Sequence, residues 1–168
     1  MMSINAPLVA EFQHESATTR KCLERLPESD FDWKPHEKSM TLGRLATHIA
    51  EMTGWIPSTF ETEEVDLASS GYVPPVITTS EDLVKLFDDN LAKAVETLKN
   101  ASDESMMQTW TLRNGEHTIF SLPRVAVVRT LFINHVIHHR GQLAVYMRLR
   151  DIPVPSIYGP SADESPAG

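Results

Sequence analysis

The sequence predicts an all-α protein built as a four-helix bundle with one small β-hairpin. Over four long stretches of the 168 residues, apolar side chains recur at intervals of three and four, the spacing of an amphipathic helix. Prolines and glycines separate these stretches. One segment, around Asn114 and Gly115, changes to the period of strands, so we expect the hairpin between the third and fourth helices.

Length and composition favour a single domain over residues 1–168, with an extended tail at about 151–168 that contains four prolines. Hydrophobic residues make up 41% of the chain, and no apolar run is long enough to span a membrane. The net charge is −8, from 15 Lys plus Arg against 23 Asp plus Glu, which disfavours nucleic-acid binding. The first twenty residues lack the features of a signal peptide, and the lone Cys22 suits a reducing compartment, so we expect a cytoplasmic protein.

The first predicted helix covers about residues 8–26 and ends at Pro27. Its buried stripe contains Phe12 and Cys22, and we interpret Cys22 as a core residue because no cation is placed to lower its pKa. Glu15 falls in the same stripe, where a buried carboxylate would need a partner. We interpret Glu15 as a partly solvated residue at the edge of the stripe.

The second predicted helix begins at Ser39 or Thr41, either of which can cap it, and stops or kinks near Trp55. His48 lies inside its apolar stripe, which is formed by Leu42, Leu45, Ile49 and Met52. A histidine in this position must satisfy both ring nitrogens. Glu51, on a neighbouring face, is a candidate hydrogen-bond acceptor for His48 or a candidate proton carrier.

The segment from about residue 61 to residue 79 has no helical period and is either a lid over a pocket or an ordinary crossover. The third predicted helix begins within residues 78–80, and its expected buried face consists of Val84, Phe87, Leu91, Val95 and Leu98. The hairpin follows between residues 106 and 120. A type I′ turn at Asn114 and Gly115 would place Arg113 opposite Glu116 and Trp110 opposite Ile119.

The fourth predicted helix runs from Pro123 to Arg150 and carries the histidines His135, His138 and His139. We expect the first and last of them to continue its core face, which is formed by Val128, Leu131, Phe132, His135, His139, Gln142, Tyr146 and Leu149. His135 and His139 are four residues apart, so both imidazoles lie on one face and can share a metal ion.

His48, on another helix, is the natural third ligand. Three histidines leave one coordination position open, which is typical of a catalytic metal. His138 is rotated by about 100° from His139 and is expected beside the ligands or facing a partner, rather than among them.

The metalloprotease pattern HExxH requires a glutamate directly after the first histidine, and this chain has Val136 there. Peptide hydrolysis by that mechanism is therefore not supported. The candidate bases are Glu51, Glu15, a metal-bound hydroxide and the ionised group of the substrate. A metal can also hold a thiol as thiolate, which needs no protein base.

Three segments resemble the DinB-like family of metal-binding four-helix proteins: TLGRLATHIAEM around His48, HVIHHRGQLAVYMRLRDIPVP with His135 and His139, and IYGPSADE in the tail. The resemblance implies an up-down-down-up bundle, a metal held by His48, His135 and His139, and a homodimer. It also implies relatives that are thiol-dependent S-transferases and isomerases. A fold and a site do not by themselves specify a reaction.

We therefore expect a divalent metal ion, with zinc or nickel favoured, and a metal-dependent enzyme that transfers a low-molecular-weight thiol to an electrophilic small molecule. Three alternatives stay open. In the first, the protein is a hydrolase that uses metal-bound hydroxide. In the second, it is a non-catalytic stress-related protein that binds a metal or ligand. In the third, it is a bundle whose core histidines bind no metal.

Overall fold

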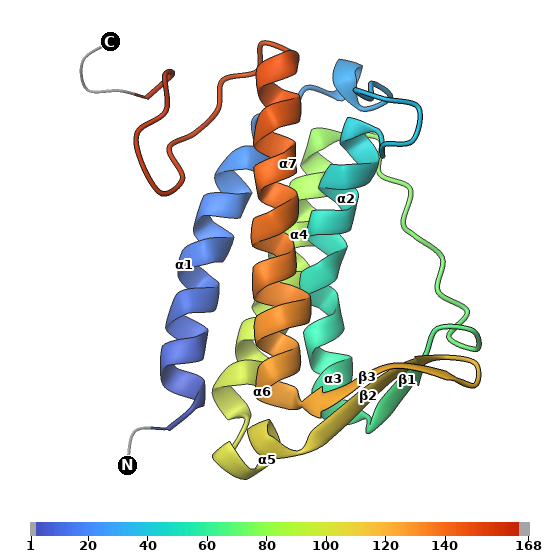
Figure 1. The fold of residues 1–168 in the computed structure, drawn as a ribbon. Helices are drawn as coiled ribbons and strands as arrows, with labels where there is room; N and C mark the ends of the chain where they lie inside the picture. The colour runs from blue at the N-terminus through green and yellow to red at the C-terminus, as the bar shows by residue number, and fades with distance from the viewer. Residues whose placement is uncertain (1–2, 165–168) are drawn as a thin grey trace.

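The computed structural model describes residues 3–164 and shows a mostly helical protein with a small sheet at one end (Figure 1). The long helices α1 (Asn5–Leu23), α2 (Leu42–Met52), α4 (Ser80–Asn100) and α7 (His135–Leu149) lie side by side. Helix α1 contacts α4 and α7, and α2 contacts the same two helices. The apolar core fills the space between them, and α2 meets α7 along the face that carries His48.

The helix starts follow the predicted caps. The side chain of Thr41 accepts a hydrogen bond from the backbone N–H of Arg44, and that of Thr79 accepts one from the backbone N–H of Asp82. Helix α1 ends at Leu23, one turn before the predicted end, and a 3₁₀ turn η1 (Glu28–Asp30) follows it.

The predicted break near Trp55 is present. A 3₁₀ turn η2 (Thr53–Trp55) interrupts the helix after α2, and α3 (Ile56–Glu61) continues it. Gly54 lies against α4 here: a Cβ atom at this position would come within 2.9 Å of the side chain of Asn90. The amide of Asn90 donates to the carbonyl of Ala50 at 3.1 Å, which ties α4 to the end of α2.

The protein is mostly helical, as predicted, but the sheet within residues 3–164 has three strands and not the two of the predicted hairpin. Strands β2 (Thr109–Asn114) and β3 (His117–Pro123) pair in antiparallel fashion, and β1 (Glu64–Asp66) pairs with β2 in parallel. Strand β1 lies in the segment expected to have no regular structure. The short helix α5 (Asp103–Met107), between α4 and β2, was also not predicted.

The predicted register of the turn is wrong as well. Asn114 pairs with His117, so Gly115 and Glu116 form the turn, and a register shift between Leu112 and Arg113 places Trp110 opposite Leu122. Gly115 has φ +61°, whereas Asn114 stays in the strand. Strand β1 contributes to this difference, because the carboxylate of Asp66 accepts from the backbone N–H of Gly115 at 2.8 Å.

The last long helix consists of α6 (Arg124–Val127), a π-helical stretch η3 (Val128–Asn134) and α7. A π-helical turn holds more residues than an α-helical turn, so the core face is displaced along the sequence. The buried residues of α7 are Val136, Arg140, Leu143 and Met147. The predicted core face is therefore wrong beyond Phe132: Gln142 and Leu149 are exposed, and His135 and His139 lie at the edge of the core.

The predicted face of α4 is also displaced. Leu83, Phe87, Ala94 and Leu98 are its buried residues, while Val84, Leu91 and Val95 are only partly buried.

The buried face of α7 includes a charged residue, Arg140. Its side chain is 1% exposed and pairs with the carboxylate of Glu15 at 2.6 Å. It also donates to the hydroxyl of Tyr158, in the segment that follows α7. That segment has no helix up to Glu164, as predicted, and the rest of the predicted tail lies outside the described residues. No helix within residues 3–164 has both the length and the apolarity that crossing a bilayer requires.

Candidate metal centre

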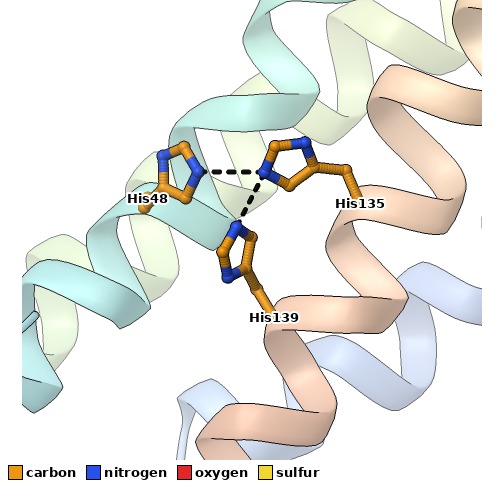
Figure 2. Close-up of side chains that lie close together, drawn as sticks. All are labelled: His48, His135 and His139. Atoms are coloured by element: carbon orange, nitrogen blue, oxygen red, sulfur yellow. Dashed lines mark hydrogen bonds between the residues drawn. The ribbon is translucent and has the colours of Figure 1, made fainter. Parts of the chain in front are cut away.

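Two helices bring the three predicted histidines together. Helix α7 presents His135 and His139 one turn apart, and α2 presents His48 opposite them, so the three rings point toward one another (Figure 2). The π-helical stretch ends at Asn134, directly before the first of these ligands. Irregular turns of this kind occur often at functional sites, because they reorient the side chains that follow.

The three Nε2 atoms face a common point. The Nε2 atom of His135 lies 3.3 Å from that of His48 and 2.7 Å from that of His139. All three ligand atoms lie within 4.8 Å of one another. Zinc–nitrogen bonds of about 2.0–2.1 Å at tetrahedral angles would hold nitrogens about 3.3 Å apart. The Nε2 atoms of His48 and His135 already have this separation, and that of His139 would have to move to complete a site for an ion of this size.

Hydrogen bonds on the far side of two rings fix which nitrogen carries the proton. Nδ1 of His48 lies 3.0 Å from a carboxylate oxygen of Glu51, and Nδ1 of His139 lies 2.7 Å from the amide oxygen of Gln142. Both oxygens only accept, so both Nδ1 atoms donate, and the Nε2 atoms of these rings carry lone pairs. His135 has one Nε2–H at most and can satisfy one of those two lone pairs. A cation at the common point would satisfy all three nitrogens, so the residues fit a metal ion.

The rings of His135 and His139 are also kept neutral, which is the form that binds metals. Burial lowers the pKa of His135 to about 4, and the neighbouring imidazoles of His139 and His48 contribute in the same direction. Burial likewise lowers the pKa of His139, although its hydrogen bond to Gln142 opposes the shift. Near neutral pH no proton therefore competes for these two nitrogens.

The site is open on one side. A hollow of about 390 Å³ is lined by His135 and His139 together with Thr130, Asn134 and His138. His138 is exposed, and its ring centroid lies 5.0 Å from that of His139, so it borders the cluster as expected of a residue that is not a ligand. Small molecules can approach two of the three candidate ligands through this hollow.

The two candidate carboxylates have different positions. Glu51 contacts His48, as the sequence predicted, and also accepts from Arg44 at 2.9 Å and from the hydroxyl of Tyr72. Burial would raise the pKa of Glu51, but the hydrogen bonds from His48, Tyr72 and Arg44 outweigh burial and keep it below its usual value. Glu51 is therefore an ionised hydrogen-bond acceptor.

Glu15 is not part of this cluster. It is 8% exposed, and its carboxylate pairs with Arg140 and accepts from the hydroxyl of Tyr158 at 2.8 Å. The interpretation of Glu15 as a partly solvated edge residue is therefore wrong, because Arg140 compensates its charge inside the protein. Cys22 is fully buried, and burial raises the pKa of its thiol to about 11, which agrees with a core role.

The sequence did not indicate three polar side chains around the histidines. Gln142 lies three residues after His139, a spacing that could have suggested their hydrogen bond. Arg44 lies two turns before Glu51 on α2, a weaker indication of the same kind. Tyr72 comes from the connection between β1 and α4, and no spacing in the sequence links it to Glu51.

Comparisons with known proteins agree with this fold. A sequence model described as the DinB family matches residues 1–166. The Bacillus subtilis (strain 168) protein named "Uncharacterized protein YrdA" is 28% identical over 157 residues, which cover 91% of this chain and 87% of that protein.

Two crystal structures are similar to the present one. A DinB-like protein from Bacillus cereus ATCC 10987 has a TM-score of 0.70 and 25% identity, covering 90% of this chain and 95% of that one. The DinB-like protein YjoA from Bacillus subtilis has a TM-score of 0.72 and 19% identity, covering 92% and 99%, and supports the fold alone.

Proposed function

The chain belongs to the DinB family, and from this premise we propose that it is a metal-dependent enzyme that transfers a low-molecular-weight thiol to an electrophilic small molecule. One observation is the main support for the metal site. Three Nε2 atoms converge, but they share at most one proton, because the hydrogen bonds to Glu51 and Gln142 hold the protons of two rings on Nδ1. This arrangement suits a cation better than a hydrogen-bonded network.

His48, His135 and His139 would hold the ion. Imidazole nitrogens suit zinc and nickel, and also iron and manganese, so the donor set favours a divalent transition metal without selecting one. A divalent ion bound there supplies a Lewis acid that lowers the pKa of a thiol or a water molecule reaching the open position. Glu51 and Gln142 orient two of the three rings, and the hollow beside His138 admits the reactants.

The state of the carboxylates favours thiol transfer over hydrolysis that is assisted by a carboxylate. Hydrolysis assisted by the protein needs a group that can accept a proton. Glu51 already accepts three hydrogen bonds with a lowered pKa, and Glu15 is paired with Arg140. Neither carboxylate is available for that task. Ionisation of a thiol by a divalent cation requires no protein base.

The test begins with metal content. Untagged protein is purified, its metals are measured by elemental analysis, and conjugation of a reactive electrophile by candidate thiols is followed with and without zinc or nickel. We expect about one metal ion per chain and metal-dependent conjugation. His139→Ala should lose both, whereas His138→Ala, which changes a neighbouring exposed histidine, should retain the metal.

Other outcomes would contradict the proposal in distinct ways. Conjugation that is no faster with metal-loaded protein than with His139→Ala removes the transferase. Metal-dependent ester hydrolysis without any thiol favours the hydrolase, and tight metal retention with neither activity favours a binding protein. A wild type that holds no more metal than His135→Ala would show that the three histidines do not bind a metal ion.

We further propose that the chain is a single-domain up-down-down-up bundle and that two copies form a homodimer. The exposed side of α7 and the β2–β3 hairpin are the candidate contact surfaces, because each carries exposed apolar side chains: Val145 is 58% exposed, Leu149 57% and Ile119 46%. Sedimentation velocity of the wild type should give a dimer, and Val145→Glu should shift it toward the monomer. A monomeric wild type would refute the association.

A further inference from the structure

One connection reaches the candidate metal centre from outside the long helices. Residues 67–79 run from the end of β1 to the start of α4 without regular structure and bow away from α2 (Figure 1). Two of their apolar side chains project into solvent, with Val73 79% exposed and Val76 88% exposed. Tyr72, between Gly71 and Val73, is 42% exposed, but its ring and hydroxyl contact Trp55 and Glu51.

Tyr72 makes two specific contacts with the body of the protein. Its hydroxyl donates to the Oε2 atom of Glu51, and its ring packs against the edge of Trp55 with centroids 5.3 Å apart. Gly71 has φ +62°, a backbone conformation that favours glycine, and a Cβ atom there would meet no other atom within 4 Å. Gly71 therefore permits the left-handed backbone conformation directly before Tyr72.

The hydrogen bonds of Glu51 are divided between its two oxygens. Oε1 accepts from Nδ1 of His48 at 3.0 Å and from Arg44 at 2.9 Å. Oε2 accepts from the hydroxyl of Tyr72, its one hydrogen-bond partner among residues 3–164. Glu51 is 6% exposed, so water cannot readily replace a lost donor. Without Tyr72, one oxygen of a buried carboxylate would lose its hydrogen bond, and the carboxylate could turn away from His48.

We propose that Tyr72 is a positioning residue for metal binding: closure of residues 67–79 onto Glu51 fixes the ring of His48 in the orientation that presents Nε2 to the ion. This inference rests on the proposed metal site. Each step is a direct contact, from Tyr72 to Glu51 and from Glu51 to His48. Groups that hold a ligating histidine through its other nitrogen change metal affinity by about 10- to 100-fold when they are removed.

Metal binding and closure of residues 67–79 should strengthen each other. If closure of the connection strengthens metal binding by some factor, metal binding must favour closure by the same factor. Tyr72 acts through Glu51 and not on the ring itself, so we expect the lower end of the range, about tenfold. Bound metal should accordingly shift the opening equilibrium of residues 67–79 toward the closed form by about tenfold.

The decisive variant is Tyr72→Phe, which removes the hydroxyl and keeps the ring that packs on Trp55. Tyr146→Phe is the matched control, because its hydroxyl donates to the carbonyl of Met40, away from the histidines. Zinc affinity of untagged protein is measured by competition with a chromogenic chelator at fixed pH, and far-UV circular dichroism verifies the fold. We expect about tenfold weaker zinc binding for Tyr72→Phe and unchanged binding for Tyr146→Phe.

Hydrogen–deuterium exchange of residues 67–79 measures the reciprocal effect. Zinc should protect this segment in the wild type, and the protection should be lost in Tyr72→Phe even at zinc concentrations that saturate the variant. Equal zinc affinity of Tyr72→Phe and the wild type, or no protection of the segment by zinc, would overturn the coupling.

Zinc binding by the wild type, His135→Ala and Tyr72→Phe separates failure of the metal site from failure of the role of Tyr72. If the wild type binds zinc no better than His135→Ala, the metal site and this inference are both overturned. If the wild type binds zinc, His135→Ala does not, and Tyr72→Phe matches the wild type, the metal site stands and only the role of Tyr72 is wrong.

Discussion

Replacing Glu15 by glutamine would remove one charge from a buried ion pair while keeping the size of the side chain. Its partner Arg140 is 1% exposed and would remain charged inside the core. Breaking a buried pair from one side costs about 3–5 kcal/mol, because the remaining charge loses its compensation. Glutamine can still accept a hydrogen bond from Arg140, so we expect the lower end, about 3 kcal/mol.

For a chain of this size, that loss lowers the melting temperature by about 6–12 °C, which calorimetry or thermal circular dichroism can measure. Glu11→Gln is the matched control, since Glu11 is on the same helix and pairs with Arg129 at the surface, where both side chains are more than a third exposed. Its effect should stay below about 1 kcal/mol.

Zinc binding and conjugation per folded molecule should be unchanged in Glu15→Gln. If the two variants are equally stable, the structural role of the Glu15–Arg140 pair is refuted. If Glu15→Gln keeps its stability and loses conjugation, Glu15 is instead a proton carrier.

Burial and available space lead to three more expectations. In metal-free protein the free energy of unfolding should fall by about 1 kcal/mol as the pH drops from about 6.5 to about 4, after allowing for partial exposure. The reason is that His135 has a pKa of about 4 when folded and takes up its proton only on unfolding. Denaturant titrations at several pH values should show that the free energy of unfolding depends less steeply on pH in His135→Ala. Gly43→Ala should destabilise the protein by about 1–3 kcal/mol, since a Cβ atom would lie 2.8 Å from Cβ of Phe31. Gly141→Ala has open space in an exposed helical position and should stabilise the protein by about 0.5–1 kcal/mol. Urea midpoints equal to that of the wild type would contradict both expectations. The Cys22 thiol, with a pKa of about 11, should resist a disulfide reagent at a pH of about 8 in folded protein and react on unfolding, and rapid labelling of the folded form would contradict its burial.

The sequence predicted the parts of the site that repeat along a helix. His135 and His139 are separated by one turn, and His48 lies among apolar residues of another helix, so their types and spacing identify the cluster. Which charged side chains lie inside the core was harder to predict. A buried arginine cannot be distinguished from a surface arginine by its type, and the partner that makes its burial possible, Glu15, is far away in the chain.

The remaining differences come from contacts between distant segments. Strand β1 is too short to show a period, and it forms because residues near Val65 pair with Leu112 and its neighbours. The hydrogen bond from Tyr72 to Glu51 depends on the path of an irregular connection. Interactions of this kind depend on the completed fold, which local patterns do not encode.

The π-helical stretch Val128–Asn134 makes the orientation of the ligands depend on how the residues before them wind. Its wider turns absorb about one extra residue, so the same residues wound as an ordinary α-helix would rotate everything beyond them by about 100° relative to the packed residues before them. His135 and His139 would keep their spacing and no longer face His48. Two chains with the same histidine pair can therefore differ in metal binding through the winding of a stretch that lies outside the pair.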